Sequence, residues 1–130
     1  MGPHYLNRLF SPRAIAVLGA SERLDSVGGR VLDNLRRNGF PGPIYAINPK
    51  YTQIGGLPCY RSIHDIDGEV DLAVIATPAA SVAEIIHDCG ERGIRAAIII
   101  SAGFSEGGEA GARLEKQLFL RRAGGLHISG

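Results

Sequence analysis

The sequence predicts an α/β fold built on a doubly wound parallel sheet. Five short apolar runs alternate with segments of helical periodicity, which is typical of strand–helix–strand units with right-handed crossovers. The middle runs are apolar throughout, as expected of strands that are covered on both faces. The chain is long enough for one domain. We therefore expect residues 1–130 to form three layers, α/β/α, around five parallel strands in the order 3-2-1-4-5.

The five expected strands are short and separated by turn residues. They are AIAVL, IYAIN, DLAVIA, AAIIIS and LHIS, at residues 14–18, 44–48, 71–76, 96–101 and 126–129. In this numbering the run at residues 71–76 is the third strand, because residues 51–70 are interpreted as a connection. That connection is expected to hold one short helical turn near residues 62–66.

Three amphipathic helices are expected between the strands. The first begins at Ser26, a residue type that caps helices, and ends near Gly39. The second begins at Ser81, which has capping-box spacing to Glu84, and ends near Gly93.

The third helix is expected from about Glu109 to Ala123, in the segment before the last strand. Leu114 and Leu118 lie four residues apart there, which matches one face of a helix. Two glycines directly after this segment are interpreted as its stop.

Composition excludes several classes of partner. The chain is 45% hydrophobic and 21% charged with a net charge of +1, so we expect no nucleic-acid partner. It has no signal peptide and no apolar run long enough to span a membrane, so we expect no membrane partner. Cys59 and Cys89 form no C-x-x-C pair and are interpreted as packed thiols in a reducing cytoplasm.

The first expected loop, after residue 18, is rich in small residues. Ligands of doubly wound sheets bind beyond the carboxyl ends of the strands, and the loop from Gly19 to Gly29 leads there into a helix N-terminus. Free amides and the helix dipole favour an anion at such a place. The loop lacks the dinucleotide spacing G-x-G-x-x-G, which indicates a different phosphate compound.

The second expected loop contains Asn48, Pro49 and Lys50. An acid commonly binds the ribose of NAD at this position, but the chain has no acid between Ile44 and Gln53. Lys50 instead favours a phosphate on the ribose, which both coenzyme A and NADP carry.

Two further loops complete the expected site. Thr77 and Pro78 are interpreted as an adenine contact, and the backbone near residues 100–103 is expected to face the arm of the ligand. The predicted binding residues are Gly19, Ala20, Ser21, Ser26, Val27, Gly28, Asn48, Lys50, Thr77, Pro78, Ile100, Ser101, Ala102 and Gly103. We expect no catalytic residue and no metal ligand. The four histidines are interpreted as structural or solvated: His4, His64, His87 and His127.

Several stretches together resemble one family. These stretches are SPRAIAVLGAS, SVGG, GFPGPIYAINPKY, IGGLPCYRSI, VDLAVIATPAASVAEII and AAIIISAGFSEGGEAG. They resemble the N-terminal CoA-binding domain of ADP-forming acyl-CoA synthetases, which Pat-type lysine acetyltransferases also carry, and more distantly the α subunit of succinyl-CoA synthetase.

The resemblance implies a Rossmann-like fold that binds coenzyme A or acyl-CoA. It implies that the loop at residues 19–29 holds the ADP portion of CoA and that Lys50 meets a CoA phosphate. It further implies that Ile100, Ser101 and Ala102 line the path of the pantetheine arm.

The resemblance also implies that the chain is one module of a larger enzyme. In the synthetases a phosphorylated histidine and the ATP/ADP site belong to other domains, so we expect those domains as partners and no reaction in this module alone. The alternatives are a stand-alone CoA-binding protein, an NAD(P)-binding domain and, last, a receiver-like signalling module. Ligase or acetyltransferase, the acyl substrate, the role of Glu106 and a homo-oligomer stay open.

Overall fold

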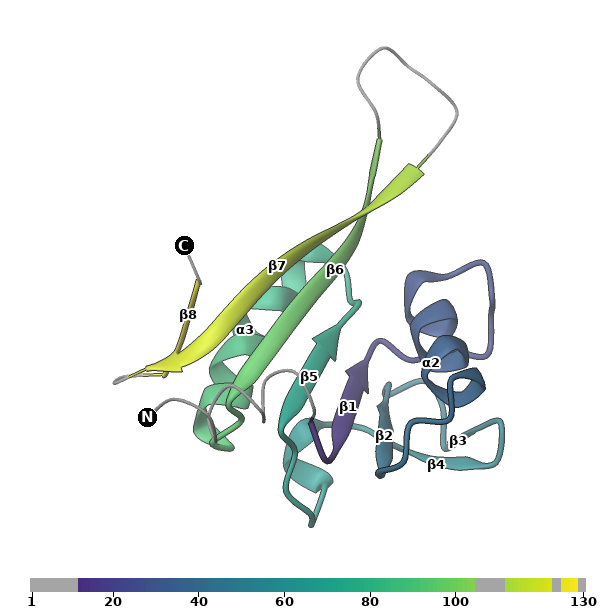
Figure 1. Ribbon diagram of the computed structural model, residues 1–130, viewed down its shortest axis with the longest axis horizontal. Coiled ribbons are helices and arrows are strands. Elements are labelled where there is room, and N and C mark those ends of the chain that lie inside the picture. The colour runs from purple at the N-terminus through teal and green to yellow at the C-terminus, as the bar shows by residue number, and fades with distance from the viewer. Residues whose placement is uncertain (1–11, 105–111, 123–124, 129–130) are drawn as a thin grey trace.

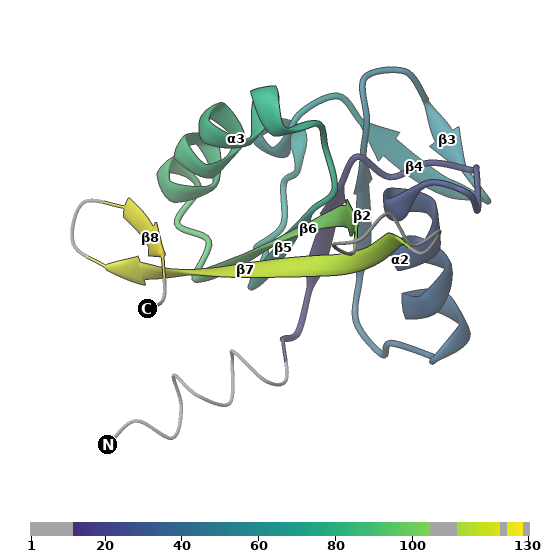
Figure 2. The same ribbon diagram turned by 90° about the horizontal axis from the view of Figure 1, so that it is seen from above.

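The structure is a computed structural model and describes residues 12–104, 112–122 and 125–128. Within these residues the chain forms one eight-stranded mixed sheet in the order β3-β4-β2-β1-β5-β6-β7-β8. One α-helix covers each face of the sheet, as Figure 2 shows with α3 on one side and α2 on the other. The predicted α/β architecture is confirmed.

The bounds of the elements are as follows. The strands are β1 (Ile15–Leu18), β2 (Ile44–Ile47), β3 (Gln53–Ile54), β4 (Leu57–Tyr60), β5 (Leu72–Ile75), β6 (Ala96–Phe104), β7 (Ala112–Arg122) and β8 (Gly125–Ile128). The helices are α2 (Val27–Arg37), the 3₁₀ turn η1 (Ile63–Asp65) and α3 (Ala79–Glu91).

The parallel centre of the sheet consists of β4, β2, β1, β5 and β6. Numbered along the chain, these five strands have the predicted order 3-2-1-4-5, with β4 as the third strand.

The strand assignments differ from the prediction, however. The run at residues 71–76 is the fourth strand and pairs with β1, and the run at residues 96–101 is the fifth. The run at residues 126–129, predicted as the fifth parallel strand, instead contributes to β8, which is antiparallel to β7 at the edge of the sheet. The sequence did not reveal β4 because it is short, contains Pro58 and is only partly buried, so it lacks the pattern of a strand covered on both faces.

Alternation along β1 divides the core between the two faces. Ile15 and Val17 face α2, whereas Ala16 and Leu18 face α3, and all four are buried. The same division holds in β5, so each short strand contributes to both cores. Full burial of one such aliphatic side chain stabilises the fold by about 1.5–3 kcal/mol.

The two α-helices start differently. Ser26 caps α2 as predicted, because its hydroxyl oxygen accepts a hydrogen bond from the Gly29 amide at 3.0 Å. The prediction that Ser81 caps α3 is wrong. Pro78 precedes the first residue of α3, and the Ser81 hydroxyl donates to the Pro78 carbonyl from inside the first turn. Pro78 takes the capping position, so the helix begins three residues earlier than a Ser81 cap would indicate.

The predicted helix over residues 109–123 is also wrong where the structure describes the chain. Residues 112–122 form β7, which pairs antiparallel with β6 from Phe104–Ala112 to Ala96–Leu120. Figure 1 shows the two strands as a long twisted hairpin at one side of the molecule. The four-residue spacing of Leu114 and Leu118 suits one face of a strand as well as one face of a helix, and pairing with β6 decides between them.

Candidate functional site

A cavity of about 830 Å³ lies at the carboxyl ends of β1, β2 and β5. This is the edge of the sheet where the sequence predicted ligand binding. Seven predicted residues line the cavity: Gly19, Ser21, Ser26, Asn48, Lys50, Thr77 and Pro78. The predicted strand ends therefore meet in one place, with the exception of the end of β6.

Two glycines bring the N-terminus of α2 up to the end of β1. Gly19 has a φ of +87°, and a Cβ there would lie 2.6 Å from the Ala76 carbonyl oxygen at the end of β5. A Cβ on Gly28 would lie 1.9 Å from the Gly19 carbonyl oxygen. Only residues without a side chain allow this approach of helix to strand. Gly28 is thus a packing residue and does not line the cavity.

The N-terminus of α2 has amides available for an anion. Its first turn contains no acidic residue, and Ser26 uses its side chain on Gly29. In the part of the chain that the structure describes, the amides of Val27 and Gly28 donate no hydrogen bond. These amides and the helix dipole produce a positive potential at this end of the helix.

Asn48 joins the first loop to the second. Its side-chain nitrogen donates to the Ala20 carbonyl at 2.9 Å, and its side-chain oxygen accepts from the Lys50 amide at 2.9 Å. The amide of Gly19 donates to the carbonyl of Ile47 in addition. Asn48 therefore holds the glycine turn and the backbone of Lys50 in fixed relative positions.

Three cationic side chains line the cavity, and one of them is paired. Arg23 forms an ion pair with Asp25 at 2.8 Å, which raises the pKa of Arg23 and lowers the pKa of Asp25. Lys50 and Arg61 form no ion pair within the described ranges and are exposed. These two cations are available to a negatively charged ligand.

Thr77 presents a polar atom without a partner. Its hydroxyl oxygen is buried and makes no hydrogen bond in the structure, whereas the residue lines the cavity. A buried hydroxyl without a partner costs about 1–3 kcal/mol. A ligand that hydrogen-bonds this hydroxyl would remove that cost.

Other predicted site residues lie outside the cavity. Ala20 is fully buried, and Ile100 packs on the core beneath α2. Residues 101–103 continue β6 opposite β7, so no loop begins at residue 101. Their predicted roles, like that of Val27, stay predictions, and Glu106 lies outside the described residues.

The cavity is also lined by residues that were not predicted as site residues, and seven of these carry polar or charged side chains that have no other role assigned above. They are Arg23, Asp25, Tyr51, Arg61, Ser62, Glu84 and Asp88. Arg61 directly follows β4, so recognition of that strand would have placed it at the same edge as Lys50. Tyr51 follows Lys50. Its hydroxyl lies 3.2 Å from the Ser21 hydroxyl, within hydrogen-bonding distance, and both residues line the cavity.

The family follows from a match along most of the chain. A family model described as a CoA binding domain matches residues 13–124. The chain belongs to this family. A CoA-binding domain with a Rossmann-like fold is what the sequence predicted, and the match includes every strand that borders the cavity.

Relatives of this CoA-binding domain are much longer proteins. The chain is 44% identical over 126 residues to acetate–CoA ligase [ADP-forming] II of Archaeoglobus fulgidus, a match that covers 96% of the chain and 19% of that protein. It is 42% identical over 113 residues to the α subunit of acetate–CoA ligase [ADP-forming] II of Pyrococcus furiosus, covering 87% of the chain and 24% of the subunit. The chain thus spans about a fifth to a quarter of these relatives.

A solved structure shows the same fold. The dinucleotide-forming acetyl-coenzyme A synthetase 1 of Ca. Korarchaeum cryptofilum, in complex with phosphate and ADP, superposes with a TM-score of 0.72 at 44% identity. The superposition covers 81% of this chain and 23% of that one. The predicted resemblance to the N-terminal part of ADP-forming acyl-CoA synthetases is confirmed.

No helix in the described residues of this CoA-binding domain is long and apolar enough to cross a membrane.

Proposed function

We propose that the chain binds coenzyme A in the cavity at the carboxyl ends of β1, β2 and β5, as the CoA-binding module of an ADP-forming acyl-CoA synthetase. The observation that supports this most is that Ser26, which caps α2, lines one cavity together with Lys50 and Arg61 in a member of the CoA-binding family. The free amides at the start of α2 lie beside this cavity. Coenzyme A carries a diphosphate and a ribose phosphate, so it matches two separate sources of positive charge.

Charge within the cavity suggests how the ligand is oriented. Lys50 and Arg61 follow β2 and β4, whereas Glu84 and Asp88 enter from α3 on the other side. The phosphates belong at the cationic side, with the diphosphate at the N-terminus of α2 and the ribose phosphate at Lys50. Thr77 and Pro78 are the proposed adenine contact, where the Thr77 hydroxyl would gain a partner.

The chemistry of the complete enzyme belongs to residues outside this chain. We infer that ATP, ADP and the acyl substrate are handled by other domains or subunits, with which this module assembles. Because the relatives reported above are ligases, we favour a ligase over an acetyltransferase. Self-association and the predicted cytoplasmic location stay predictions.

Thermal unfolding of the 130-residue chain with four ligands tests the proposal: CoA, dephospho-CoA, NADH and NADPH. Coenzyme A at a hundred times its dissociation constant should add about 2.7 kcal/mol to the free energy of unfolding, whereas NADH should add little. Stabilisation by NADPH but not by CoA would show an NADP site instead. Absence of stabilisation at millimolar CoA would contradict binding by this module.

Lys50→Ala tests the placement of the ribose phosphate. One hydrogen bond to a charged group is worth about 1.5–3 kcal/mol, or one to two decades of affinity. Dephospho-CoA should therefore bind the unmodified chain about ten- to a hundredfold more weakly than CoA, and Lys50→Ala should abolish this difference. Arg30→Ala, on the exposed side of α2, is the control and should preserve it.

A further inference from the structure

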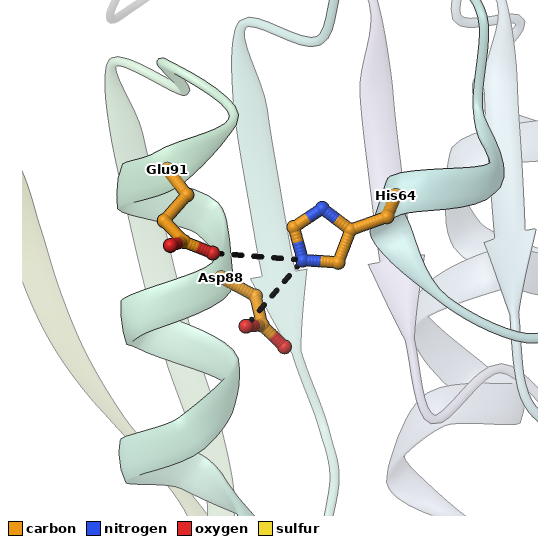
Figure 3. Close-up of side chains that lie close together, drawn as sticks. All are labelled: His64, Asp88 and Glu91. Carbon is orange, nitrogen blue, oxygen red and sulfur yellow. Dashed lines mark ion pairs between the residues drawn. The ribbon is translucent and has the colours of Figure 1, made fainter.

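Three metal-binding side chains meet beside the cavity, from two elements of the fold. His64 belongs to η1, and Asp88 and Glu91 belong to the last turns of α3. One ligand atom from each lies within 4.8 Å of the others. Figure 3 shows the imidazole of His64 directed toward α3, with both carboxylates facing it.

The distances suit a divalent transition metal. The His64 Nε2 atom lies 3.4 Å from Asp88 Oδ1 and 3.9 Å from Glu91 Oε1. Ligand bonds to Zn²⁺ of about 2.1 Å in a tetrahedron separate neighbouring ligand atoms by about 3.4 Å. The three atoms therefore surround a point that a zinc ion reaches with small side-chain adjustments, and open positions remain for water.

The backbone that carries these ligands is held in place. The guanidinium of Arg92, directly after α3, donates to the Ile66 carbonyl at 2.6 Å and to the Gly68 carbonyl at 2.7 Å. Ile63 and Cys89, beside the ligands, are fully or almost fully buried in one core cluster. The positions of η1 and α3 are thus fixed before any ion binds.

The ligands themselves are also oriented. Asp88 and Glu91 lie three residues apart on one face of α3. The Oε2 atom of Glu91, the oxygen that is not paired with His64, lies 3.5 Å from His87 Nε2. A contact to the second oxygen of a carboxylate ligand helps to orient that ligand in metal sites.

We propose that His64, Asp88 and Glu91 bind a divalent transition-metal ion such as Zn²⁺ at the edge of the cavity. An imidazole nitrogen with two carboxylates favours zinc and similar ions over Mg²⁺, which prefers oxygen ligands alone. No spacing in the sequence indicates this site, because His64 lies 24 residues before Asp88 and only the packing of η1 on α3 brings them together. Asp88 also lines the cavity, so the proposed ion site borders that cavity.

Titration calorimetry of the 130-residue chain with ZnCl₂, without CoA, tests this site independently of the proposed function. The unmodified chain should bind one equivalent. Loss of residues that only orient ligands commonly weakens metal binding by about 10–100-fold, so His64→Gln and Asp88→Asn should each weaken it by at least about a hundredfold. Asp65→Asn, next to His64 and outside the triad, is the matched control and should bind as the unmodified chain does.

Circular dichroism verifies the fold of each variant, and Glu91→Gln replaces any variant that does not fold. Failure of the unmodified chain to bind one equivalent of zinc would overturn the proposal. So would zinc binding that is unchanged in His64→Gln and Asp88→Asn, since the ion would then be held elsewhere. Because CoA is absent from the titration, neither outcome depends on whether the chain binds CoA.

Discussion

The cavity edge and the β6–β7 hairpin are built from strands of opposite character. β1 and β5, which end at the cavity, have four residues each, and all of them are buried. β6 and β7 have nine and eleven residues, and the described side chains of β7 are exposed or half-buried. In β1 and β5 every side chain is buried in the core, on one face of the sheet or the other. In β6 and β7 the extended backbone conformation depends on hydrogen bonding between the two strands more than on burial of side chains.

The largest expected effect concerns the close packing at the cavity edge. Gly28→Val places a side chain against the Gly19 carbonyl, which is backbone and cannot move aside cheaply. We expect a loss of about 3 kcal/mol or more in the free energy of unfolding, measured with urea.

Gly90→Ala is the matched control for Gly28→Val. A Cβ on Gly90 meets its nearest neighbour at 3.6 Å, an ordinary contact. Alanine inside α3 should stabilise the chain by about 0.5–1 kcal/mol. If Gly28→Val were as stable as the unmodified chain, the contact between α2 and β1 described above would be wrong.

The core beneath α3, which lies over the hairpin side of the sheet, provides the next effect. Cys89 is fully buried, and burial raises the pKa of its thiol to about 12. Above pH 9 the unfolded chain loses this proton before the folded chain does, so stability falls as the pH rises. Between pH 8 and pH 10.5 the unmodified chain should lose about 2 kcal/mol more than Cys89→Ala, measured by urea unfolding. Equal losses in the two proteins would show that the thiol is accessible to water.

Leu120→Ala distinguishes a strand from a helix at residues 112–122. In the strand, Leu118 and Leu120 lie on one face and both pack on the core beneath α2, whereas in a helix they would point in nearly opposite directions. Because Leu120 is half-buried, we expect a loss of about 1–2 kcal/mol. Lys116→Ala, exposed on the same strand, should change stability by less than about 0.5 kcal/mol. Similar small effects of both substitutions would favour the helix.

The smallest expected effect returns to the cavity. Thr77→Val replaces the hydroxyl that lacks a partner with a methyl group of similar size. Without ligand, the variant should be as stable as the unmodified chain or more stable by about 1 kcal/mol, because a buried polar atom is removed. Its affinity for CoA should fall about tenfold, measured by calorimetry. Thr52→Val, at an exposed threonine, is the control and should change neither the stability nor the CoA affinity. An unchanged CoA affinity in Thr77→Val would show that the ligand does not hydrogen-bond the Thr77 hydroxyl.

The sequence predicts an element correctly where the local sequence pattern matches the contacts that the element makes in the folded chain. Ser26 was identified as a cap because its hydroxyl acts on an amide three residues away. Ser81 has the same chemistry, but Pro78 starts the helix before it. The cavity was located because parallel strands end at one edge of a sheet, and Lys50 lies three residues after the end of β2. Arg61 was missed because it follows β4, whose partly exposed residues resemble a loop.

By itself, the sequence determined the buried parallel strands, the start of α2, the edge of the sheet at which the cavity lies and the family. Each of these depends on residues that are close in the chain or on a strand that is apolar on both faces. Only the tertiary structure decided that residues 112–122 form a strand, that β4 joins the sheet and that His64 meets Asp88 and Glu91. These features require contacts between distant segments, and no local spacing determines which segments will pair.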